Sequence, residues 1–126
     1  MAYLEELPDQ CPPASAQDQA FGPAYRILPA ANVTVAHFHS YQALGLPKPG
    51  GVDDCRYVSC SLFTCVTAAK KIARMPKKRA TSTHLATVMI QQGDGSSDIK
   101  DNTTHVDFWP FSTFNVGNAV TQVEAL

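Results

Sequence analysis

A short aromatic segment near the C-terminus carries the two side chains best suited to move a proton. His105 and Asp107 lie two residues apart in HVDFWPF, where aromatic and β-branched residues predict a strand over 105–111 that ends around Pro110. Because side chains alternate along a strand, both point to one face. We expect a catalytic pair in which the carboxylate orients the imidazole, or in which both groups face a ligand. The alternative is a surface acid beside its histidine.

A basic run in the middle of the chain suggests a second kind of chemistry, the binding of an anion. The segment KKIARMPKKR (70–79) has six cations and no acid, although the whole chain has ten basic and eleven acidic residues. Its cations are Lys70, Lys71, Arg74, Lys77, Lys78 and Arg79. We expect this surface to contact an acidic protein or a nucleic acid, and the alternative is a solvated helix face with a basic loop after it.

The cysteines do not form a recognisable metal motif. Cys55, Cys60 and Cys65 are five residues apart, and Cys11 lies in a proline-rich segment. Structural zinc usually takes two pairs of ligands at C-x₂₋₄-C spacing, so no metal site is predicted. The N-terminal sequence MAYLEELPDQ lacks the basic and apolar regions of a signal peptide. We therefore expect a cytoplasmic protein with reduced thiols rather than disulfides.

Length and composition restrict the class of protein. A chain of 126 residues suits one domain, and 44% hydrophobic residues exclude wholesale disorder. The formal net charge of -1 excludes a polycationic binder. No apolar run approaches the roughly 20 residues that span a bilayer, so we expect no membrane partner.

The pattern of apolar residues and breakers predicts a small α+β domain over residues 22–126, with residues 1–21 as an irregular arm. We expect a mixed or antiparallel sheet with about two helices. Expected strands cover 24–28, 55–61, 84–92 and 105–111, and residues 118–126 form a last strand or a helix. Expected helices cover 34–44, with a strand over 33–38 as the alternative, and 61–75, while 93–97 is a turn.

The order of these segments resembles that of the ADP-ribosyltransferase superfamily. A strand with Tyr25-Arg26 is followed by YVSCSLFTCVTAAKKIARM and then by LATVMIQQGDG. In that superfamily an aromatic-Arg strand precedes an aromatic-x-Ser-x-Ser strand that leads into an alanine-containing helix. A strand that ends near a glycine turn comes next. Ser59-Cys60-Ser61 is similar to the family's Ser-Thr-Ser, and the resemblance covers residues 24–95.

The resemblance implies that NAD or a related nucleotide is the ligand. Arg26 would anchor the pyrophosphate, because guanidinium offers a planar fork of donors. Ser59 or Ser61 would hold that arginine or the ribose, and Trp109 would stack on nicotinamide or adenine. The alternatives are that Arg26 is a pairing residue on a strand, that the serines cap the following helix, and that Trp109 belongs to the core.

One part of the family's pattern has no counterpart in this chain. The Glu-x-Glu or Gln-x-Glu motif that provides the family's catalytic acid is missing from this chain. Among the acidic residues near the C-terminus, Glu124 is isolated, and Asp107 is the better placed to serve as that acid. Two functions therefore follow as expectations. One is an ADP-ribosyltransferase or NAD glycohydrolase, which can be degenerate, and the other is a non-catalytic interaction or accessory module that uses residues 70–79.

Overall fold

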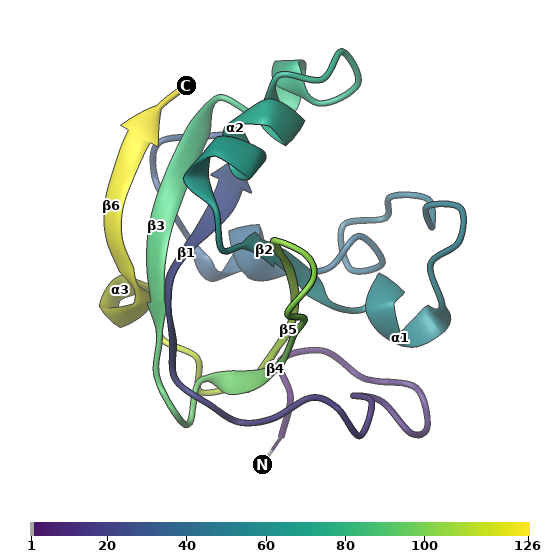
Figure 1. Cartoon of the computed structure of the whole chain (residues 1–126). Coiled ribbons are helices and arrows are strands. Elements are labelled where there is room, and N and C mark those ends of the chain that lie inside the picture. The colour runs from purple at the N-terminus through teal and green to yellow at the C-terminus, as the bar shows by residue number, and fades with distance from the viewer. Residues whose placement is uncertain (1) are drawn as a thin grey trace.

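Six antiparallel strands form a single sheet with the order β4-β5-β2-β1-β3-β6 (Figure 1). The computed structural model describes residues 2–126. Its strands are β1 (Phe21–Leu28), β2 (Cys60–Phe63), β3 (His84–Ile90), β4 (Gly95–Ile99), β5 (His105–Pro110) and β6 (Val120–Ala125). Its helices are α1 (Asp54–Tyr57), α2 (Val66–Ala73) and α3 (Val116–Ala119), and the 3₁₀ turns are η1 (Val35–Phe38) and η2 (Arg79–Thr81). The predicted α+β fold is confirmed.

The sheet order brings segments from distant parts of the sequence together. β2 lies between β1 and β5, with Ser61 opposite Asp107 and Phe63 opposite His105 on β5. On its other side β2 pairs with β1 at a single register position, Tyr25 opposite Phe63. Backbone groups beyond that position need other partners, because buried polar groups of the main chain are almost always hydrogen-bonded.

Alternation along β2 and β5 gives the sheet one apolar face and one polar face in this region. Leu62, Val106 and Phe108 are completely buried in the main core, which also includes Phe38 and Phe114. The residues between them, including the predicted site residues of β2 and β5, point to the opposite face. A smaller cluster of Phe63, Ala69 and Leu85 lies between the sheet and α2.

Local hydrogen bonds explain two errors in the sequence-based prediction before β2. The strand expected over 55–61 is wrong in its first half, because the Asp53 side chain accepts from the backbone N–H of Arg56 and caps α1. The helix expected over 34–44 is reduced to η1, where Thr34 N–H donates to His37 Nδ1 at 3.1 Å. Neither the rest of that helix nor the alternative strand over 33–38 is formed.

Other boundaries also differ from the prediction. The helix expected over 61–75 begins only at Val66, because Leu62 and Phe63 belong to β2. The turn expected over 93–97 continues as β4, in which Gly95 packs so closely on β5 that an added Cβ would lie 2.4 Å from Trp109 O. The tail forms both α3 and β6.

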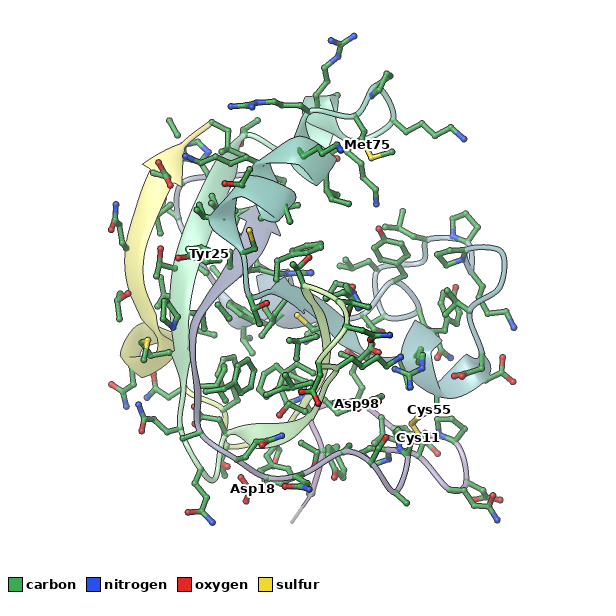
Figure 2. All side chains as sticks on the ribbon, in the orientation of Figure 1. Cys11, Asp18, Tyr25, Cys55, Met75 and Asp98 are labelled. Atoms are coloured by element: carbon green, nitrogen blue, oxygen red, sulfur yellow. A yellow bond between two sulfur atoms is a disulfide. The ribbon has the colours of Figure 1, made fainter. Side chains whose placement is uncertain are left out.

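The N-terminal segment, residues 2–20, contacts the edge strand β4 and the end of its neighbour β5. Leu4 N–H donates to Pro110 O at 2.9 Å, and Gln17 and Ser97 exchange two backbone hydrogen bonds of 2.9 Å. Cys11 and Cys55 form a disulfide that joins this segment to α1 (Figure 2). The expectation of reduced thiols is therefore wrong for these two residues, which lie 44 positions apart and are brought together only by the fold. Cys60 and Cys65 are free.

We expect removal of the disulfide to destabilise the fold. A cross-link over 44 residues restricts the unfolded chain by about 4 kcal/mol in the chain-entropy description. Thermal unfolding followed by circular dichroism should show that Cys11→Ser with Cys55→Ser lowers the Tm by roughly 10 °C or more. Cys65→Ser, a free and half-buried thiol, is the matched control. Equal Tm values for the two variants would contradict a stabilising disulfide.

Candidate functional site

The largest set of predicted site residues meets around one cavity of about 330 Å³. Strands β1, β2 and β5 form one wall, and the segment from His39 to Tyr57 forms the other. The predicted residues that line it are Arg26, Ser59, Ser61, His105 and Asp107. Further lining residues are His39, Tyr41, Pro49, Val52, Arg56, Tyr57 and Lys100. Trp109 is not among them: it is 1% exposed, and its indole N–H donates to Cys55 O at 3.1 Å.

Arg26 connects β1 to β2 where the two strands lack ladder hydrogen bonds. Its Nε donates to His37 O at 2.9 Å, and its Nη1 donates to Ser61 O at 2.9 Å. These bonds satisfy two backbone carbonyls and fix the guanidinium at the cavity. The remaining nitrogen, Nη2, has no acceptor among residues 2–126 and stays available to a ligand.

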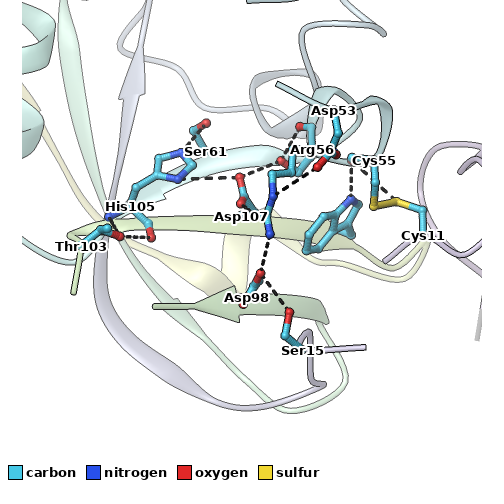
Figure 3. Close-up of polar contacts among 12 residues, drawn as sticks. Cys11, Ser15, Asp53, Cys55, Arg56, Ser61, Asp98, Thr103, His105 and Asp107 are labelled. Atoms are coloured by element: carbon cyan, nitrogen blue, oxygen red, sulfur yellow. Dashed lines mark hydrogen bonds and ion pairs between the residues drawn. A yellow bond between two sulfur atoms is a disulfide. The ribbon is translucent and has the colours of Figure 1, made fainter. Parts of the chain in front are cut away.

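Arg56 is the main functional residue that the sequence did not reveal. It lies in α1 and forms ion pairs with two carboxylates whose side chains are 6% exposed, Asp98 on β4 at 2.9 Å and Asp107 on β5 (Figure 3). Partial burial alone would lower the pKa of Arg56, but the hydrogen bonds and charges of Asp98 and Asp107 outweigh it and raise the pKa. No motif marks this residue, because its two buried carboxylate partners are more than 40 positions away.

A row of polar side chains, joined by two hydrogen bonds and one longer contact between His105 and Asp107, runs across β2 and β5. His105 Nε2 lies 2.9 Å from Ser61 Oγ, and His105 Nδ1 lies 3.7 Å from Asp107 Oδ1. Ser59 Oγ donates to Asp107 Oδ1 at 3.2 Å from the other side. Burial lowers the pKa of His105, the charges of Lys100 and Arg56 lower it further, and the charge of Asp107 acts against them. The imidazole is therefore neutral at pH 7, in the form that accepts a proton.

The cavity combines positive charge with an aromatic wall. Three cationic side chains line the cavity, those of Arg26, Arg56 and Lys100, against one lining carboxylate, that of Asp107. Tyr41 and Tyr57 lie on the wall opposite the sheet. Residues 2–126 contain no group of three or more His, Cys, Asp or Glu side chains arranged to hold a metal ion. The chemistry of this donor set therefore suits an anionic ligand that also carries a flat ring.

The basic run 70–79 lies on α2, η2 and the segment between them, and within residues 2–126 only Lys78 of its six cations makes a polar contact with a residue that lines the first cavity. Lys70 is 3.7 Å from Glu124, while Lys78 Nζ donates to Tyr41 Oη and lies 4.9 Å from the centre of that ring. Lys70, Arg74 and Arg79 also line a second cavity of about 400 Å³. No helix among residues 2–126 is both long enough and apolar enough to cross a membrane.

Comparisons with known proteins provide no relative from which a function could be transferred. No protein-family model, curated protein or solved structure matches the chain. The chemistry of the cavity must therefore be argued from its own residues.

We expect Arg56 to be essential to the stability of the site. Arg56→Gln would leave Asp98 and Asp107 buried without a cation, and breaking such a pair costs about 3 kcal/mol or more. Urea unfolding should show this loss in the free energy of unfolding. Lys48→Gln is the matched control, because its partner Asp54 is 80% exposed and the pair is screened by water. A loss of similar size in both variants would contradict a special role for Arg56.

Proposed function

We propose that this protein binds NAD or a related nucleotide in an ADP-ribosyltransferase-like site. One observation carries the proposal: Arg26, Ser61 and Asp107 come from β1, β2 and β5, three strands adjacent in the sheet, and line one cavity. The resemblance rests on the Arg strand and the Ser-x-Ser strand, and Asp107 on a later strand is the acid that we propose in place of the missing Glu-x-Glu motif. These three features share a site only if their strands are neighbours, as they are in this sheet.

The charges of the cavity support a pyrophosphate as the part of the ligand that is held. Arg26 offers its free Nη2, and Lys100, which is exposed, has no carboxylate partner within 4.0 Å among residues 2–126. Arginine and lysine bind phosphate through charge-assisted hydrogen bonds. Tyr41 and Tyr57 are in position to contact a nicotinamide or adenine ring, a role that the resemblance gave to Trp109. Trp109 instead packs beneath α1.

The ion pair between Asp107 and Arg56 supports binding of NAD more strongly than its rapid cleavage. Cleavage of the nicotinamide bond builds positive charge on the ribose, and a nearby carboxylate would stabilise that charge. Asp107 can supply this carboxylate, but it already forms an ion pair with Arg56. Because Arg56 offsets part of its negative charge, we expect NAD to be bound firmly and cleaved slowly.

Calorimetric titration of NAD and ADP-ribose into the protein tests binding. We expect both ligands to bind and nicotinamide alone to bind much more weakly, because it lacks the phosphates. Lys100→Gln should weaken ADP-ribose binding about tenfold, the effect of losing one charged hydrogen bond. Arg26→Gln should weaken it at least as much. Arg74→Gln, which removes a cation of the second cavity, should leave the Kd unchanged. Failure of the wild type to bind either ligand at millimolar concentration would overturn the proposal.

A separate assay follows the release of nicotinamide from NAD. We expect a slow rate in the wild type and a rate at least tenfold lower in Asp107→Asn, because the amide cannot offset charge on the ribose. Glu124→Gln is the control, since Glu124 lies on β6 beside Lys70 of α2 and does not line the cavity. Rates should be compared at equal folded fractions, measured by circular dichroism. An unchanged rate in Asp107→Asn would exclude this residue from the reaction.

A further inference from the structure

The side chains of Ser61, His105 and Asp107 stand in the order hydroxyl, imidazole, carboxylate (Figure 3). This order is the one in which a base activates a serine nucleophile and an acid orients the base. The register of the sheet produces it, because Ser61 pairs with Asp107 and His105 lies two residues earlier on the same face of β5. It therefore depends on two rigid strands rather than on a loop.

The surrounding contacts hold the acid and the base in place. Asp107 is fixed by the Arg56 guanidinium and by the Ser59 hydroxyl, which keep its carboxylate beside His105. The Phe63 ring meets the imidazole edge to face, with ring centres 5.6 Å apart. These contacts leave the imidazole facing Ser61 on one side and Asp107 on the other.

The protonation state of His105 agrees with the role of a base. Burial, Lys100 and Arg56 lower its pKa, and the Asp107 charge acts against them. The carboxylate facing Nδ1 favours the tautomer with its proton on that nitrogen. Nε2 is then free to accept the Ser61 proton at 2.9 Å.

We propose that Ser61 is a nucleophile activated by His105, and that the cavity accepts small acyl esters as substrates. The site has room for such a molecule, since Ser61 and His105 both line the cavity of about 330 Å³. Val52 and Tyr57 on the opposite wall provide apolar surface for an acyl group. This activity goes beyond nucleotide binding and does not depend on it.

The reaction balances without any other cofactor. Ser61 Oγ attacks the ester carbonyl carbon, its proton passes to His105 Nε2, and the carbonyl electron pair moves onto the oxygen. Arg26 and Lys100 are the lining cations that can stabilise this negative oxygen. The C–O bond to the alcohol then breaks, and His105 returns the proton to the departing alkoxide. Water removes the acyl group from Ser61 by the same two steps, so that the products are an acid and an alcohol.

A fluorophosphonate probe tests the nucleophile directly, because it forms a stable phosphorus–oxygen bond with an activated serine and releases fluoride. We expect intact-mass and peptide analysis of the whole chain to find one adduct, on Ser61. Ser61→Ala should abolish labelling, and Ser112→Ala, an exposed serine outside the cavity, should label normally. His105→Gln, which retains Ser61, should label at least tenfold more slowly. The rate of p-nitrophenyl acetate hydrolysis should rank these proteins in the same way as the labelling rate does, with Ser61→Ala inactive and His105→Gln slower than the wild type and Ser112→Ala.

The pH dependence separates a base from a structural neighbour. The labelling rate of the wild type should rise with pH and level off, with a midpoint below the ordinary histidine value, because only neutral His105 accepts the proton. His105→Gln should lack this inflection. No adduct on wild-type Ser61, or equal labelling of the wild type and His105→Gln, would overturn the proposal. Titration with ADP-ribose on the same samples reports separately whether nucleotide binding fails.

Discussion

The ion pairs of Arg56 are the interaction on which the site depends. Two carboxylates on neighbouring strands, Asp98 and Asp107, are almost fully buried, and such groups need a cation and hydrogen bonds to remain charged. Arg56 supplies the cation from α1, outside the sheet. The disulfide at the adjacent Cys55 and the hydrogen bond from Trp109 to Cys55 O hold α1 in place. The ion pairs therefore tie α1, the end of the second wall of the cavity, to β4 and β5.

The sheet order is the second constraint, and it explains which parts of the site could be predicted from sequence. The alternation of side chains along a strand was enough to place His105 and Asp107 on one face. The glycine and proline residues that interrupt secondary structure were enough to locate β1 and β3. The sequence also predicted that Arg26 and Ser61 bind a ligand, and the structure places both at one cavity. It could not show that β2 lies between β1 and β5, because strand order is set by the packing of the whole domain.

The errors arose where tertiary contacts or a side-chain cap decide the local structure. Tyr57 and the neighbouring Val58 favour a strand, yet the cap at Asp53 and the pairing of Arg56 produce a helical turn. Cys11 and Cys55 carry no pairing signal in the sequence, since the N-terminal segment is held near α1 by its bridges to Ser97 on β4 and to Phe111 just beyond β5. Arg26 was predicted to anchor a ligand, with a pairing role on the strand as the alternative, and two of its nitrogens join β1 to the main chain of η1 and β2.

The partners of Asp107 determine which chemistry the site favours. A carboxylate that stabilises a developing positive charge works best when no other cation offsets it, and Arg56 is in direct contact with Asp107. A carboxylate that orients a histidine must be held beside it, and Arg56 and Ser59 hold Asp107 there. The same ion pair therefore offsets the charge of Asp107 toward a ribose cation and toward an imidazolium alike, while it fixes the carboxylate beside His105. The position of Asp107 beside His105, fixed by Arg56 and Ser59, is therefore the feature on which the proposed proton transfer from Ser61 depends.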